Sequence, residues 1–251
     1  VSLNHIDKAL DIVSDIYLNS TFPEKELEKE KGVIIEEINM YKDLPQRIVV
    51  KEFYRLLYGD QPAGRSTIGP KENIQKMQRR DFIDYRHKHY VASATTVIVA
   101  GKINEKDVLK KVQILFKGVS KWKKEEKKRV VESQATPQVR VFYKDTDQTH
   151  IVLGNRSFNV YNKYNPIIRV LVGVLSGGMS SRLFQKMREE MGICYYVGAD
   201  NDVFTDHGAF AVFAGVDSTR VKDAIVAILA ELKKMRTELV GKEELHKVKK
   251  Q

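Results

Sequence analysis

The chain has 251 residues, of which 42% are hydrophobic and 30% are charged, and its formal net charge is +10. This composition excludes disordered and fibrous proteins, and the length allows one large domain or two ordinary ones. The apolar runs are far too short to span a bilayer, so we predict no membrane partner. The single cysteine, Cys194, excludes an intrachain disulfide and a thiolate zinc cluster. It is typical of a core residue and mildly favours a reducing compartment such as the cytoplasm.

The positive charge is spread along the chain and does not form a concentrated patch. Its densest run, KWKKEEKKRVV at residues 121–131, is interrupted by glutamates, and no platform of aromatic and basic side chains of the kind that single-stranded nucleic acids need accompanies it. We therefore predict no nucleic-acid partner, whereas polar or acidic peptides are compatible with this charge.

The first half of the chain is predicted to be mostly helical. Pro23 and Pro45 stand where helices are expected to begin. The Lys/Glu-rich region that follows, residues 118–137, ends in SQATP and is typical of a linker. Hydrophobic periodicity predicts helices at 4–18, 24–42, 46–58, 71–78, 80–89 and 104–117, and one strand at ATTVIVAG, residues 94–101.

The second half alternates strands with helices. Its predicted strands are VRVFYKD, HIVLGNRSF, CYYVGADND and GAFAVFAGVD, which occupy residues 139–145, 150–158, 194–202 and 208–217. Its predicted helices lie at 164–176, 180–191 and 218–238. The predicted fold class is α+β, with antiparallel strands and helices packed on one face.

Two segments far apart in the chain share a plan. Residues 6–31 and 221–250 each contain an apolar helix, a short break and a charged second helix. If this is a repeat, the strands and helices that precede the second copy have counterparts upstream of residue 1. The chain is then an internal piece of a longer protein, with both domains incomplete. The alignment places Glu30 opposite Val248.

Two carboxylates lie on the apolar face of the helix predicted at 24–42. At about 100° per residue, Glu37 falls about 20° from Glu30, close to Ile34 and Tyr41. A buried ionised carboxylate costs several kcal/mol unless it is paired or coordinated. Three explanations are open: a basic partner, a metal, or partial exposure to a polar cleft.

The chain alone lacks the ligands of a catalytic zinc site, which usually takes three protein ligands. None of the six histidines form a pair at i and i+4, and neither HExxH nor HxxEH occurs. We therefore predict that this chain by itself does not hold zinc.

A second group of candidate residues lies in SGGMSSRLFQKMREEMGICYYVG, residues 176–198. Ser180 or Ser181 can cap a helix that follows the two glycines. Arg188 near the end of this helix and Tyr195 on the next strand could together bind a peptide carbonyl. The alternative is a surface helix in which Arg188 forms an ion pair with Glu189 or Glu190.

Four segments in this order resemble the pitrilysin and mitochondrial processing peptidase superfamily, the zinc peptidases with the inverted HxxEH motif. They are EKEKGVIIEEINMYKDLP, LYGDQPAGRSTIGPKENIQKM, FIDYRHKHYVASATTVIVAGKI and LSGGMSSRLFQKMREEMGICYYVG. The resemblance implies that Glu37 is the third zinc ligand and that Glu30 supports the metal site. It also implies that Arg188 and Tyr195 hold the substrate.

The resemblance implies two related domains, each an antiparallel sheet with helices on one face. Residues 1–120 would belong to the catalytic-type domain, 121–137 to a linker and 138–251 to a non-catalytic, substrate-binding domain. The implied protein is a zinc endopeptidase that acts on peptides or unfolded proteins in a chamber between the domains. It would contain Zn²⁺ and would be a homodimer or a partner of a related subunit.

The HxxEH motif would lie upstream of residue 1, so we expect this chain alone to be inactive. A non-catalytic partner or scaffold subunit of the same fold is the alternative, and an unrelated basic binding module is a third. Retention of Glu30 and Glu37 on an apolar face favours the peptidase.

Overall fold

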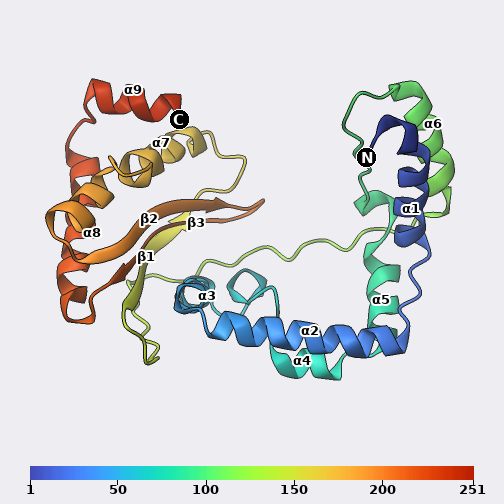
Figure 1. Ribbon diagram of the computed structural model, residues 1–251, viewed down its shortest axis with the longest axis horizontal. Helices are drawn as coiled ribbons and strands as arrows, with labels where there is room; N and C mark the ends of the chain where they lie inside the picture. The colour runs from blue at the N-terminus through green and yellow to red at the C-terminus, as the bar shows by residue number, and fades with distance from the viewer. The chain divides into compact units, whose positions relative to one another are not determined.

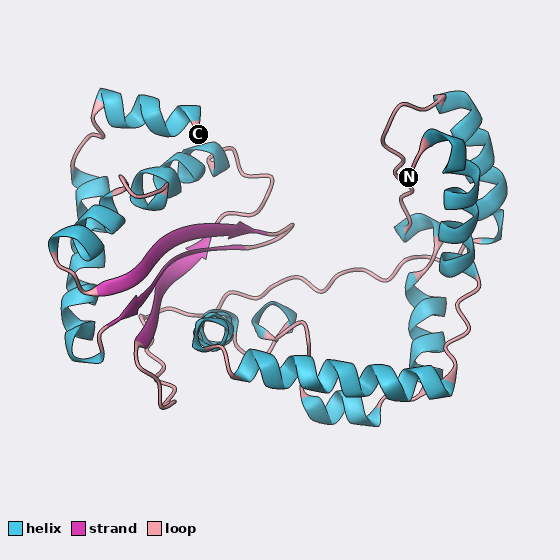
Figure 2. Cartoon of the chain, in the orientation of Figure 1, coloured by secondary structure: helices cyan, strands magenta, loops and turns pink.

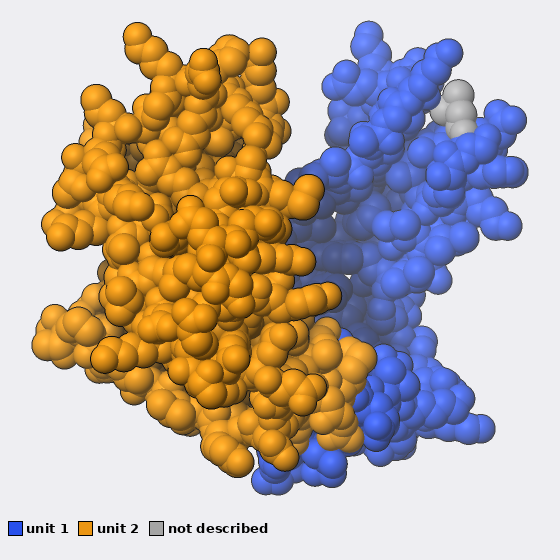
Figure 3. All heavy atoms as spheres, turned by 60° about the vertical axis from the view of Figure 1, so that its left-hand side comes forward, with its two compact units in different colours: residues 1–37, 69–128 blue, residues 38–68, 129–251 orange. Residues whose placement is uncertain are grey.

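The computed structural model describes the whole chain, residues 1–251, except for the side chain of Leu3. The chain divides into two compact units, residues 1–37 with 69–128 and residues 38–68 with 129–251, which are coloured separately in Figure 3. One helix, α2 (Glu24–Lys42), contains the boundary between them. Among the described residues no helix is both long and apolar enough to cross a membrane.

The first unit is built from helices, and those predicted from the sequence are confirmed. Besides most of α2, it contains α1 (Ile6–Leu18), α4 (Lys71–Lys76), α5 (Arg79–His89) and α6 (Glu105–Leu115). Helices α1 and α6 pack together, and the ring of Tyr17 stacks on that of Tyr90 at 4.9 Å. The Arg79 guanidinium donates to the carbonyl oxygens of Thr21 and Phe22, and thereby fixes the turn that leads into α2.

The strand predicted at residues 94–101 is wrong for the described chain. This segment carries no strand, and Ile98 is 83% exposed. A strand needs a partner for its backbone hydrogen bonds, and in the described part of this unit the only bridge is the isolated pair Val91–Ser120. All strands in Figure 2 belong to the second unit.

The second unit contains an antiparallel three-stranded sheet in the order β1–β3–β2. Its elements are α3 (Pro45–Tyr58), β1 (Thr149–Ser157), α7 (Asn165–Ser176), β2 (Cys194–Val203), β3 (Gly208–Val216), α8 (Val221–Thr237) and α9 (Lys242–Lys250). The two-residue period of β3 places Val212, Ala214 and Val216 on one face, where each is fully buried. They pack against Leu175 of α7 and Ile228 of α8. This two-layer arrangement, visible in Figure 1, confirms the predicted α+β class.

Helix α3 covers part of the opposite face of the sheet. Leu57 and Tyr58 form a second, smaller core with Ala209 of β3. The compact units consequently group residues 38–68 with the sheet, although these residues lie before the predicted linker. The domain limits inferred from the sequence, 1–120 and 138–251, remain a prediction.

The segment predicted as a strand at 139–145 is also wrong. It carries no regular structure, and Val139, Val141 and Tyr143 are each 88% exposed. Alternation of apolar residues is not sufficient for a strand without a free sheet edge beside it. Arg140 lies against α3 instead, with its Nε 2.5 Å from Glu52 Oε2, although the two groups are not aligned as a hydrogen bond.

The helix predicted at 180–191 forms with an unexpected winding. Phe184–Glu190 is a π-helix, a rare form that often occurs at functional sites. Leu183 and Met187 are fully buried on its inner side. The wider winding is therefore packed against the core.

Candidate functional site

Helix α2 forms over the range that the sequence predicts, Glu24–Lys42. It follows Pro23, and ion pairs between residues three apart run along its first half: Lys29–Glu26 at 2.8 Å and Lys31–Glu28 at 2.6 Å. Both pairs have at least one solvent-exposed partner, so each adds little to stability.

Glu30 and Glu37 are both exposed on α2 in the described chain. The apolar arc of the helix is wider than the part that is covered in the described chain. Ile38 is buried, whereas Val33 is 59% and Met40 51% exposed. The two carboxylates lie between these exposed apolar side chains.

Neither carboxylate has an ion-pair or hydrogen-bond partner in the part of the chain that the structure describes. The explanation that a lysine or arginine neutralises Glu30 and Glu37 therefore finds no support. Both glutamates lie on the helix surface with their oxygens available to groups outside it.

The residues present fit one position of a zinc site. Carboxylate oxygens are accepted zinc ligands, but the described residues contain no group of three His, Cys, Asp or Glu side chains that could hold a metal. Glu30 and Glu37 are seven residues apart, which corresponds to about 10.5 Å along a helix. That separation suits one direct ligand with one supporting group better than two ligands to the same ion.

In the second unit the structure brings Arg188 and Tyr195 together. The register of β2 against β3 shifts between Cys194 and Tyr196, so Tyr195 is the extra residue of a bulge. A bulge redirects a side chain and leaves its backbone unpaired. Arg188 Nη1 donates to the Tyr195 carbonyl oxygen at 2.9 Å, which satisfies that group.

The side chains of this pair are also stacked. The Arg188 guanidinium carbon lies 5.5 Å from the centre of the Tyr195 ring and 5.1 Å from that of Phe184, within cation–π range. Tyr195 is 70% exposed, and no partner of its hydroxyl exists among the described residues. Unused guanidinium N–H groups and a free phenol can therefore bind peptide carbonyls.

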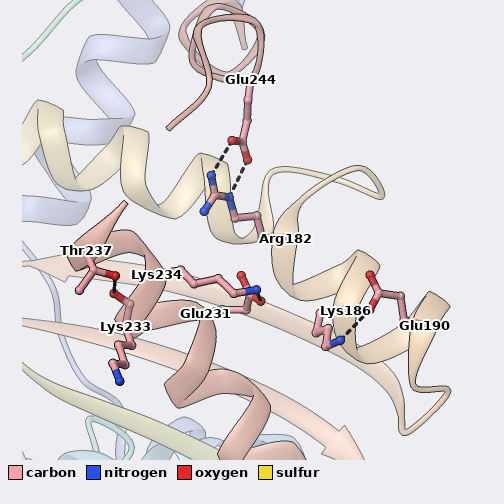
Figure 4. Close-up of polar contacts among 8 residues, drawn as sticks. All are labelled: Arg182, Lys186, Glu190, Glu231, Lys233, Lys234, Thr237 and Glu244. Atoms are coloured by element: carbon pink, nitrogen blue, oxygen red, sulfur yellow. Dashed lines mark hydrogen bonds and ion pairs between the residues drawn. The ribbon is translucent and has the colours of Figure 1, made fainter. Parts of the chain in front are cut away.

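The alternative ion pair between Arg188 and Glu189 or Glu190 is not formed. Glu190 pairs with Lys186 at 2.7 Å (Figure 4), and this contact lowers the pKa of Glu190.

Arg182, the other arginine of this motif, is structural. Its Nε and Nη2 donate to the two carboxylate oxygens of Glu244 on α9 at 2.8 and 2.7 Å (Figure 4). This fork-to-fork pairing lowers the pKa of Glu244 and raises that of Arg182. Arg182 therefore fastens α9 and does not face a substrate.

Sequence reasoning missed a pair on the open face of the sheet. His150 Nδ1 and the Tyr196 hydroxyl are 2.8 Å apart, and both residues pair with Gly215 of β3 in the strand register. Burial lowers the pKa of His150 and raises that of Tyr196, which favours the neutral form of both. The alternation of each strand could have placed both on the non-core face, but only the register makes them neighbours.

The fold described above is that of an α+β protein. The chain belongs to peptidase family M16. The family model described as "Insulinase (Peptidase family M16)" matches residues 1–71, and "Peptidase M16 inactive domain" matches residues 76–251. These matches confirm the resemblance inferred from the four motifs.

Relatives and solved structures agree with this assignment. The chain is 33% identical over 248 residues to an "Uncharacterized zinc protease" of Rickettsia felis, covering 98% of this chain and 59% of the relative. A zinc protease of Bacillus subtilis is 30% identical over 252 residues, with 98% and 60% covered. The chain therefore spans about three fifths of the length of these relatives.

Among solved structures, a protease from Helicobacter pylori has a TM-score of 0.87 at 20% identity, covering 99% of this chain and 62% of the other. A peptidase M16 inactive domain from Pseudomonas fluorescens has a TM-score of 0.85 at 18% identity, covering 99% and 60%. These two similarities support the fold.

Proposed function

We propose that the intact protein is a zinc-dependent endopeptidase, to which this chain contributes one zinc ligand and a pair of peptide-binding side chains. The observation that carries this proposal is the exposed face of α2. Glu30 and Glu37 lie there without partners, beside the exposed Val33 and Met40. Such a face suits a helix whose apolar side chains are covered by another part of the protein and whose two carboxylates serve a polar site within that interface.

Each residue has a distinct role in this proposal. Glu37 is the zinc ligand, and Glu30, two helical turns before it, orients a ligand that comes from elsewhere in the protein. Zinc, when bound, polarises the scissile carbonyl and lowers the pKa of its water. Arg188 and Tyr195 hold the peptide backbone through the guanidinium and phenol groups that remain free in the stacked pair.

The substrate class that follows is a peptide or an unfolded protein, bound in a chamber between two domains. Pairing of the intact protein with itself or with a related subunit is part of the same proposal. The chain alone holds no stoichiometric zinc and hydrolyses no peptide, because one carboxylate ligand is too few for a stable zinc site.

A non-catalytic partner or scaffold subunit is the second candidate. The observation that favours it is the match of residues 76–251, the larger part of the chain, to the inactive-domain model of the family. An intact protein that folds normally but carries no zinc would favour this second role.

The decisive experiment is Glu37→Gln in the full-length protein. Loss of a charged ligand is expected to lower zinc affinity at least about 10–100-fold, the range seen for supporting residues of metal sites. Metal analysis after exhaustive dialysis measures the zinc, and cleavage of a quenched fluorescent peptide measures activity. Glu28→Gln, an exposed glutamate on the same helix that pairs with Lys31, is the matched control. Full zinc occupancy and full activity in Glu37→Gln would refute the assignment.

The peptide-binding pair has its own test. Arg188→Lys keeps the charge but loses the planar fork and most of the stacking. We expect the KM for a peptide to rise about tenfold, which corresponds to about 1.4 kcal/mol of binding free energy, while zinc content is unchanged. An unchanged KM would remove Arg188 from the peptide-binding role.

A further inference from the structure

Within the second unit, helix α3 is held against the sheet by its aromatic side chains. The buried Tyr58 hydroxyl donates to the carbonyl oxygen of Gly208 at 2.7 Å, and the Tyr58 ring lies edge-on to His207 at 4.9 Å. Phe53 of α3 also lies close to Gly154: a Cβ atom there would be 2.8 Å from the Phe53 ring and 2.3 Å from the carbonyl oxygen of Phe210. Both α3 and the neighbouring strand β3 therefore require a glycine at this position.

A second tyrosine ties α3 to another strand of the sheet. The Tyr54 hydroxyl donates to Asp202 of β2. Burial and then the Asp202 carboxylate raise the pKa of Tyr54, and burial raises that of Tyr58 to about 12. Both phenols are thus protonated donors throughout the neutral pH range.

The end of α3 is fastened to the segment that follows the Lys/Glu-rich run. The Gln61 amide makes two hydrogen bonds with the backbone of Val131, donating to its carbonyl at 2.8 Å and accepting from its N–H at 2.9 Å. The backbone N–H of Val130 donates to Asp206 at 3.2 Å. The aromatic contacts and these hydrogen bonds together form a dock, which holds α3 to the sheet and to residues 130–131.

The turn between the end of α2 and the start of α3 is contacted by Lys144. Lys144 donates to the carbonyl oxygen of Lys42, the last residue of α2, and its Nζ lies 3.8 Å from Asp43. A cation at this position satisfies a terminal carbonyl and interacts favourably with the helix dipole. The short turn between α2 and α3 is therefore held by the same unit that holds α3.

We propose that this dock positions Glu37, with Tyr54 and Tyr58 as positioning residues for the zinc ligand. Glu37 lies five residues before Lys42, about 7.5 Å along a continuous helix. The contacts of Lys144 and of α3 hold the last turn of α2, and because the helix is continuous they restrain the backbone at Glu37. The inference rests on the proposed function, because it assigns Glu37 to the metal, but it names residues and contacts that the zinc site itself does not include.

The test is the double variant Tyr54→Phe/Tyr58→Phe in the full-length protein, which keeps both rings and removes both donors. The matched control is Tyr143→Phe/Tyr161→Phe, two tyrosines that are 88% and 79% exposed. Each lost hydrogen bond is worth roughly 1 kcal/mol, or about fivefold in an equilibrium. We expect zinc to be lost to a chelator about 5–25-fold faster, kcat to fall by a similar factor and KM for the peptide to stay within about twofold.

Amide hydrogen exchange supplies a readout that does not depend on activity. Residues 38–58 should exchange faster in the double variant, whereas residues 212–216 of β3, which lie in the main core, should be unaffected. If the double variant fails to fold, Asp202→Ala removes the exposed acceptor of Tyr54 and leaves the buried Tyr58 contact in place.

Two results separate this inference from the proposed function. If Glu37→Gln loses zinc but the tyrosine variant retains it with unchanged kcat, the dock has no positioning role and the inference is overturned. The same holds if only KM rises. If Glu37→Gln itself keeps zinc and activity, the ligand assignment fails first and the inference fails with it.

Discussion

The repeat predicted from the sequence pairs α1–α2 with α8–α9, and the second helices of these two pairs have different surroundings in the structure. Helix α9 is packed on α7: Val248 Cγ1 lies 2.4 Å from the position that a Cβ on Gly173 would occupy. The Arg182–Glu244 ion pair fastens the same helix. At the matching position of α2, Glu30 is exposed and has no partner in the described part of the chain.

The difference shows how one helical scaffold can be used for packing or for polar chemistry. In the α9 copy, a valine on a glycine gives close contact and removes apolar surface from water. In the α2 copy, a carboxylate at this position costs little while it is exposed, and under cover it needs a metal or a basic group. Glu30 and Glu37 therefore do not destabilise the folded chain while they are exposed to solvent, and in a covered site they would need a metal or a basic group beside them.

The largest expected effect on stability comes from giving the α9 copy the residue of the α2 copy. Val248→Glu places a carboxylate against Gly173 of α7, where α9 is closely packed. We expect α9 to be destabilised by about 2 kcal/mol, from lost packing and from desolvation of the charge. Amide exchange of α9 measures this change. Val248→Ala, which loses only the packing, should cost about half as much, and equal costs would contradict the argument.

Gly173 of α7, which lies under α9, and Gly32 of α2 provide a second and smaller comparison. Gly173→Ala brings a methyl group to 2.4 Å from Val248, whereas a Cβ on Gly32 of α2 meets nothing within 4 Å. We expect Gly173→Ala to loosen α9 by about 1 kcal/mol, since overpacking outweighs the gain in helix propensity. Gly32→Ala should stabilise α2 by about 0.5–1 kcal/mol. Amide exchange of α9 and of α2 measures the two changes in helix stability. If both variants stabilise or both destabilise the helix measured, the argument that one helix face is covered and the other open would be wrong.

The parts of this fold that could be predicted from the sequence are those that depend on local interactions. The helices were found because periodicity and helix-start signals act within a few turns. The segments 94–101 and 139–145 have the composition of strands, but strands require partners that no local pattern can guarantee. The three strands that did form, β1, β2 and β3, pair with one another within the second unit.

The candidate site divides in the same way. Arg188 and Tyr195 are seven residues apart, so a helix and the strand after it could bring them together. The bulge at Tyr195, which frees its carbonyl for Arg188, depends on the register with β3 and left no sequence signal. Contacts from Tyr54 to Asp202 and from Tyr58 to Gly208 join residues about 150 positions apart, and no periodicity indicates them.

The smallest effect on stability is expected for the reverse exchange, Glu30→Val in α2. The side chain is exposed and unpaired, so the free energy of unfolding of this chain should change by no more than about 0.5 kcal/mol. In the full-length protein the same variant should weaken zinc retention about 10–100-fold, because a supporting carboxylate is lost. Chelator competition measures that retention, with Glu28→Gln as the control. A small change in stability combined with unchanged zinc retention would mean that Glu30 is a surface glutamate, and the two helix pairs would then differ in packing alone.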